Sequence, residues 1–276
     1  MKLASKLILL SAVLFYLTAC TGYEKVLKSN DFKWKYREAV NYYKSQDYIR
    51  AATLFDQIAT VFRGTDLADS VYFLQAMSYF HQRDYLLSGH YFRTFAQTYG
   101  GSSFVEQADF MSAFCYYLSS PRPELDQSTT VQAIQAFQLF LIKYPGTERK
   151  EEVTGYLNEL REKLVEKSYL SAKLYYQLSD YKASIVALNN SLLKYPDSEH
   201  REEIMFMLVK SSYMLADNSV LTKKKDRFQD TIDEYYSFAA EFPESKYIRE
   251  AKRYYRFAAR YLGEDIVEEN ETEEIN

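Results

Sequence analysis

Residues 172–197, AKLYYQLSDYKASIVALNNSLLKYPD, decide the fold of this chain. The stretch opens with Ala172, three residues before a Tyr-Tyr pair, and Asp180 then precedes a second run that closes with Tyr195-Pro196. An aspartate before a helix can accept N–H bonds from its first turn, and a proline does not continue a helix. The stretch therefore predicts two helices joined by a turn.

The same pattern recurs five times along the chain. Its closing aromatic residues are Phe62, Tyr99, Tyr144, Tyr195 and Phe242. The small residue of the first helix recurs as Ala39, Ala76, Ala113 and Ala172. A small residue lets two helices approach closely, and a ring one turn away fills the space beside it. The sequence thus predicts an all-α fold, a superhelix of the tetratricopeptide (TPR) type with about five helix–turn–helix repeats, capped by a helix around Glu250–Tyr255.

The repeats have unequal lengths, and we expect their extra residues in loops between units. The predicted organisation is a signal peptide at 1–19, a lipidated tether at 20–31, N-terminal repeats one and two with the first helix of repeat three at 32–118, an inserted loop at 119–127, C-terminal repeats three to five with the capping helix at 128–263, and a disordered acidic tail at 264–276. The tail holds seven acidic residues and no basic one, so the chain's net charge of −4 belongs to the tail.

The N-terminus is predicted to be an export signal. Its apolar run, Leu7–Tyr16, is shorter than the ~20 residues that span a bilayer, which favours a cleaved signal peptide over a membrane anchor. Residues 17–20, LTAC, resemble the lipobox of bacterial lipoproteins, so Cys20 is the predicted lipidation site. The alternative is an ordinary signal peptide that happens to contain a cysteine.

Lipidation at Cys20 leaves the other cysteine, Cys115, without an intramolecular partner, and its apolar surroundings predict a small buried residue. Thr21–Lys25 contains neither an aspartate directly after the cysteine nor an acidic run, the signals for inner-membrane retention and surface export. We therefore expect the protein on the periplasmic face of the outer membrane of a Gram-negative cell. Its acyl chains, palmitate among them, would be the membrane anchor.

Several functional classes are disfavoured. With 47% hydrophobic and 26% charged residues the chain is foldable, and 8 Gly and 5 Pro are too few for an all-β protein. A nearly neutral body argues against nucleic-acid binding. The histidines lack the spacing of metal-binding or catalytic motifs. The sequence therefore predicts no enzyme, no metal site and no cofactor apart from the covalent lipid.

The repeats offer an aromatic groove instead. In the TPR pattern, first-helix residues three before and four after the small position face the concave side, and here all of them are aromatic. Those in repeats one to three are the candidate peptide-binding residues: Tyr36, Tyr43, Phe73, Phe80, Phe110 and Tyr117; repeat four adds Tyr169 and Tyr176. Aromatic grooves hold extended peptides by apolar contact. The alternative is that these rings pack between adjacent helices as core.

The chain resembles the BamD family, the TPR lipoproteins of the outer-membrane β-barrel assembly (BAM) machinery. The resemblance rests on LREKLVEKSY at 160–169, DYKA at 180–183, KYPDS at 194–198, DSVYFLQAMSY at 69–79 and PRPELDQ at 121–127. It runs from about Trp34 to Leu262. Two residues depart from it, because Ala76 replaces a common glycine and Ala187 an arginine of some relatives.

The resemblance implies a non-enzymatic subunit that helps to fold and insert β-barrel proteins. The N-terminal repeats would receive the aromatic-ended C-terminal signal of unfolded substrates, and the C-terminal repeats would bind the POTRA domains of the barrel subunit BamA. Other BAM lipoproteins are further implied partners. Two alternatives stay open: an envelope-division coordinator and a glycan-uptake binding lipoprotein, both of them TPR-based.

Overall fold

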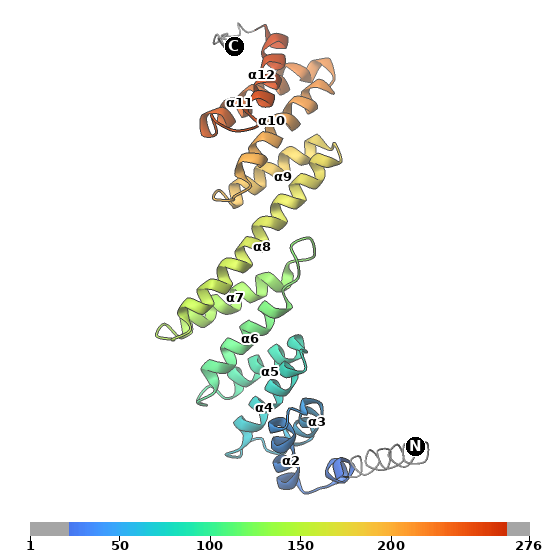
Figure 1. The fold of residues 1–276 in the computed structure, drawn as a ribbon, viewed down its shortest axis with the longest axis vertical. Helices are drawn as coiled ribbons and strands as arrows, with labels where there is room; N and C mark the ends of the chain where they lie inside the picture. The colour runs from blue at the N-terminus through green and yellow to red at the C-terminus, as the bar shows by residue number, and fades with distance from the viewer. Residues whose placement is uncertain (1–21, 264–276) are drawn as a thin grey trace, which may run out of the picture. The chain divides into compact units, whose positions relative to one another are not determined.

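The computed structural model describes residues 22–263, and every regular element within them is a helix (Figure 1). After a short helix at residues 22–28 come α2 (Phe32–Lys44), α3 (Tyr48–Ile58), α4 (Ala68–His81), α5 (Tyr85–Thr98), α6 (Val105–Ser119), α7 (Ser128–Lys143), α8 (Lys150–Gln177), α9 (Tyr181–Lys194), α10 (Arg201–Asp217), α11 (Leu221–Glu241) and α12 (Ile248–Leu262). None of these helices is long and apolar enough to cross a bilayer. The predicted signal peptide, Cys20 and the acidic tail lie outside the described residues.

The helices form five consecutive pairs, from α2/α3 to α10/α11, followed by α12. This confirms the all-α, TPR-type prediction of about five repeats and a capping helix. Aspartates begin three of the second helices as expected: Asp47, Asp84 and Asp180 each accept an N–H bond from the first turn, at 3.1–3.2 Å. The residue before each aspartate has a left-handed backbone, with φ between 59° and 65°. This conformation ends the first helix of the pair and turns the chain into the direction of the second helix.

The extra residues of the repeats are not all in loops. The segment between α6 and α7 is indeed non-helical, but the surplus of repeat four lies in α8, which has 28 residues. No proline interrupts Lys150–Gln177, and its one glycine, Gly155, lies in open space within the helix. The expectation of loops between units is wrong here, because a helix without a breaker simply continues.

Contacts divide the chain into two compact units, with the boundary inside α8 after Leu160. The first unit ends there, apart from residues 122–124, which belong with Arg161 onward in the second. In the first unit Phe92, Phe95 and Phe137 are at most 1% exposed, and the small positions Ala39, Ala76 and Ala113 are fully buried. In the second unit Leu188, Ile204 and Phe238 are fully buried. Each unit therefore has its own apolar core.

Cys115 is a buried member of the first core, as predicted, with 1% of its surface exposed. Its burial raises the pKa of the thiol to about 11. Opposite it, Gly89 on α5 lets α5 and α6 approach, since a Cβ added there would lie 3.0 Å from the Cβ of Cys115.

Replacing Gly89 with leucine should lower the free energy of unfolding by about 1–3 kcal/mol, because a well-packed core resists added volume. The matched control is Gly155→Ala, a helical glycine with open space around it. There the loss of backbone freedom in the unfolded chain should raise stability by about 0.5–1 kcal/mol. Urea unfolding of both variants measures the difference. Equal stability of the two variants would contradict the close approach of α5 and α6.

Three of the corners between hairpins repeat one hydrogen-bond arrangement. A hydroxyl group accepts the N–H two residues later and donates to an acidic side chain at the start of the preceding first helix. The donor–acceptor pairs are Ser102–Asp69 at 2.9 Å, Thr147–Glu106 at 2.7 Å and Ser245–Glu202 at 2.6 Å. The corner at Ser198 differs, because Arg161 donates to both carboxylate oxygens of Asp197, at 2.9 and 2.8 Å. Long α8 thus brings different residues to this corner.

Candidate functional site

The candidate peptide-binding rings separate into two groups by their burial. Phe73 and Phe110, before the small position, are 7% and 4% exposed and lie in the core. Phe73 stacks on Phe104 at 4.8 Å, and Phe110 contacts Phe140 at 5.8 Å. Neither ring is therefore open to a peptide, because Phe73 is covered by the next hairpin and Phe110 by the second helix of its own hairpin. Tyr169 of the second unit is likewise buried.

The rings after the small position are only half-buried, and they remain candidates for contact with a ligand: Tyr43, Phe80, Tyr117 and Tyr176. Tyr36 is also half-buried and lies 5.7 Å from Phe62. In the first unit Tyr43, Phe80 and Tyr117 join into a row with four further rings. We define the aromatic ladder as Tyr43, Tyr48, His81, Phe80, Phe114, Tyr117 and Tyr156.

The first end of the ladder is built by the turn between α2 and α3 and by the end of α4. His81 stacks on Tyr48 at 4.3 Å, and its Nε2 lies 3.4 Å from the hydroxyl of Tyr43. Burial lowers the pKa of His81, which keeps the ring neutral at pH 7. Beside these rings is a pocket of about 460 Å³, whose wall includes Ile49, a residue 69% exposed.

The ladder continues across α6 to the start of α8. Phe80 contacts Phe114 at 6.2 Å, and Phe114 stacks on Tyr117 at 5.7 Å. Tyr117 lies 4.4 Å from Tyr156 and donates a hydrogen bond to Glu159, which with burial raises the pKa of Tyr117 to about 12. Such a row of ring faces can hold apolar and aromatic side chains with little loss of rotamer freedom.

Sequence reasoning missed four members of the ladder: Tyr48, His81, Phe114 and Tyr156. Phe114 lies four residues after Phe110 and three before Tyr117, and this helical spacing places all three on one face. The sequence could therefore have identified it. His81 and Tyr156 lie outside the repeat positions, so only the structure brings them to the ladder. Lys33, Arg37 and Lys44 are exposed on α2, and of these Lys44 directly follows Tyr43 at the end of the helix.

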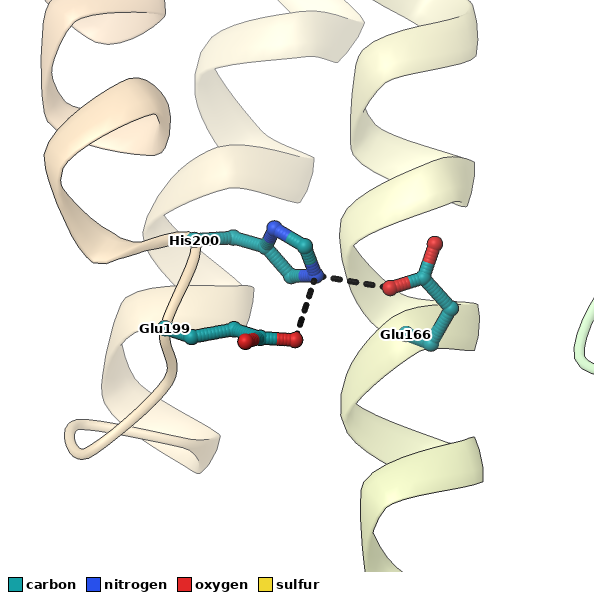
Figure 2. A group of neighbouring side chains, drawn as sticks. All are labelled: Glu166, Glu199 and His200. Carbon is teal, nitrogen blue, oxygen red and sulfur yellow. Dashed lines mark hydrogen bonds and ion pairs between the residues drawn. The ribbon is translucent and has the colours of Figure 1, made fainter.

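A second group lies at the start of α10 in the second unit. His200 Nε2 faces Glu166 Oε2 at 2.6 Å and Glu199 Oε1 at 3.7 Å, and its ring stacks on Tyr169 at 3.9 Å (Figure 2). Among the described residues these three could hold a metal ion. The Glu199 side chain is 85% exposed, whereas Glu166 and His200 already satisfy each other. The group is best described as a hydrogen-bonded pair that ties α8 to the corner before α10.

A third feature is an acidic pocket of about 270 Å³ among α9, α10 and α11. Its lining residues are Ile185, Ser212, Leu215, Arg227, Asp230, Asp233 and Glu234. Burial, together with the neighbouring Asp230 and Asp233 carboxylates, raises the pKa of Glu234 from its ordinary 4.5 to about 7. The folded protein therefore binds a proton that the unfolded chain releases between these pH values.

This proton predicts a pH dependence of stability. As the pH rises from about 4.5 to about 7, stability falls, and the full penalty is present above pH 7. Glu234→Gln should remove this fall and raise the free energy of unfolding at pH 8 by about 1–3 kcal/mol, with little change at pH 4. Thermal unfolding across this pH range measures it. Glu244→Gln, an exposed position, is the control, and an E234Q profile parallel to the wild type would refute the assignment.

Comparison with known proteins decides the family. The family model for YfiO, described as an outer membrane lipoprotein, matches residues 29–186 and again residues 166–265. The chain belongs to this family. The YfiO family contains the BamD proteins, so the resemblance drawn from the sequence is confirmed. A YfiO-family chain with a helical-repeat fold is an outer-membrane lipoprotein of the scaffold kind.

Other comparisons add little to the YfiO assignment. The search of curated proteins finds no match. A solved structure of the yeast Sti1 TPR2AB domain in complex with pHSP90 is 13% identical, covers 83% of this chain and 98% of that chain, and has a TM-score of 0.37.

Proposed function

We propose that this chain is a non-enzymatic, lipid-anchored subunit of a BAM-type assembly complex. Its first unit binds aromatic-ended segments of unfolded β-barrel substrates along the aromatic ladder. Its second unit binds the POTRA domains of a BamA-like barrel subunit, and other BAM lipoproteins complete the complex. The lipid is attached at Cys20 and holds the protein to the periplasmic face of the outer membrane. No metal or soluble cofactor takes part.

The observation that carries the proposal is the ladder itself. Its rings are half-buried apart from the exposed His81. They run through three consecutive hairpins to the start of α8 and adjoin a pocket beside Tyr48 and His81. An unfolded barrel segment is extended and alternates apolar with polar residues, so its apolar side can lie on such a row. Exposed basic residues on α2 suit a terminal carboxylate. The YfiO match supports the scaffold role, since partner binding is what repeat surfaces of this kind perform.

Affinity purification from detergent-solubilised outer membrane tests the proposal. We expect the chain to recover a barrel protein that carries POTRA domains. Recovery of a glycan transporter instead would favour nutrient uptake, and recovery of division proteins would favour an envelope coordinator. Either result in the absence of a POTRA-bearing barrel would overturn the assembly role.

A further inference from the structure

The segment just after the predicted lipid site is packed against the first hairpin. Val26 is 4% exposed and belongs to the core of α2 and α3. Tyr23 meets the ring of Tyr42 edge-on at 5.6 Å, and the Arg50 guanidinium lies over both rings, at 5.2 and 5.7 Å. Residues 22–28 therefore form part of the folded unit.

The turn that follows is also ordered. The Ser29 N–H donates to the Val26 carbonyl at 3.1 Å, and the Ser29 hydroxyl accepts the Asp31 N–H at 3.0 Å. Asp31 then caps α2 by accepting the Trp34 N–H at 2.9 Å. The sequence predicts a tether over residues 20–31. In the structure, residues 22–31 of that stretch are ordered and packed against α2 and α3.

Chain length then limits how far the hairpin can lie from a lipid on Cys20. Only three Cα–Cα steps separate Cys20 from Tyr23, and a fully extended chain spans at most about 11 Å over them. This reach is comparable to the thickness of the headgroup region of one leaflet. A lipid buried in the bilayer through Cys20 therefore holds Tyr23 at the membrane surface.

The residues near this point have the chemistry of a membrane interface. Residues 22–50 contain seven lysines and arginines against four acidic residues, although residues 22–263 as a whole are almost neutral. Lys25, Lys28 and Lys33 are exposed there. Tyrosine rings and long cationic side chains both favour the headgroup layer, and each basic residue near an anionic surface contributes about 1 kcal/mol.

We propose that residues 22–50 dock on the phospholipid surface, so that the first hairpin rests on the membrane and does not hang below it on a linker. The inference rests on the proposed lipidation of Cys20 and goes beyond it, because an anchor alone does not require contact between the hairpin and the lipids. The occupant of this surface is the headgroup layer of an anionic bilayer.

The single tryptophan of the chain, Trp34, lies in the first turn of α2 and gives a direct test. The lipidated full-length protein is placed in vesicles of three parts phosphatidylethanolamine to one part phosphatidylglycerol that also contain a headgroup-nitroxide lipid. We expect Trp34 emission to fall about twofold relative to vesicles without the nitroxide, given the short reach from Cys20. The matched variant carries a twelve-residue Gly/Ser insertion between Gly22 and Tyr23, which adds about 20 Å of root-mean-square reach.

The insertion variant should float with the vesicles as the wild type does, yet recover most of its Trp34 emission. A second variant, Lys25→Gln/Lys28→Gln/Lys33→Gln, should keep the anchor and lose part of the quenching. If the wild type floats and Trp34 is unquenched, or is quenched equally in the Lys25→Gln/Lys28→Gln/Lys33→Gln variant, docking through these residues is refuted while the anchor stands. If mass spectrometry finds no lipid on Cys20 and nothing floats, the anchor fails and the docking proposal falls with it.

Discussion

Replacing Phe137 with alanine will lower the free energy of unfolding of the first unit by about 3–5 kcal/mol. Phe137 on α7 is fully buried and stacks on Tyr156 at 5.5 Å. It also lies 6.2 Å from Phe110 and 6.4 Å from Tyr117. The substitution removes the ring shared by α6, α7 and the start of α8, and it leaves a cavity that rigid neighbouring helices cannot close.

Leu139→Ala on the same helix is the matched control, because this side chain is 63% exposed. We expect it to change stability by less than about 0.5 kcal/mol. Urea unfolding followed by far-ultraviolet circular dichroism gives both values. A similar loss for the two variants would mean that α7 faces its neighbours differently from the arrangement described.

The double variant Tyr43→Ala/Phe80→Ala is expected to weaken binding of a peptide from the C-terminus of an outer-membrane barrel protein about 100-fold, or about 2.8 kcal/mol. Both rings are half-buried, so they keep free surface for a ligand. The two substitutions remove the ring contacts of Tyr43 with Tyr48 and of Phe80 with His81 and Phe114, so the ladder is no longer continuous. Fluorescence anisotropy of a labelled peptide measures the change.

The control for this experiment is Tyr175→Ala/Tyr236→Ala, which removes two exposed tyrosines of the second unit, 42% and 54% exposed. Its peptide affinity should equal that of the wild type. Thermal unfolding of both double variants checks that the folded state is retained. Phe80→Leu is a further control, because it keeps an apolar side chain at this position of the ladder. Unchanged affinity of a folded Tyr43→Ala/Phe80→Ala protein would remove the ladder as the binding surface.

Local chemistry made much of the fold predictable. Asp47, Asp84 and Asp180 begin helices because a carboxylate satisfies a free N–H, and this requirement depends only on neighbouring residues. Small residues such as Ala113 mark close helix contacts, because only a small side chain leaves room for a neighbouring helix to approach. The length of α8 was harder to predict, because the repeat spacing does not tell whether added residues extend a helix or a loop.

The site was predictable only in part, since exposure depends on a neighbour distant in sequence. Phe73 and Phe80 are both aromatic positions of one helix, yet Phe104 from the next hairpin covers the first and leaves the second half-open. Glu166 and His200 are 34 residues apart, so their pairing has no signature in the sequence. Where two helices pack together, the sequence pattern of one helix alone does not predict which of its side chains stay exposed.

The most direct test of the ladder is site-specific photo-crosslinking in intact outer membranes. A p-benzoylphenylalanine replaces Phe80 on the ladder or, in the control, the exposed Leu139 on α7. We expect an unfolded β-barrel substrate to crosslink through its C-terminal segment at position 80 and not at position 139. Equal crosslinking at both positions, or substrate captured at position 139 alone, would contradict it.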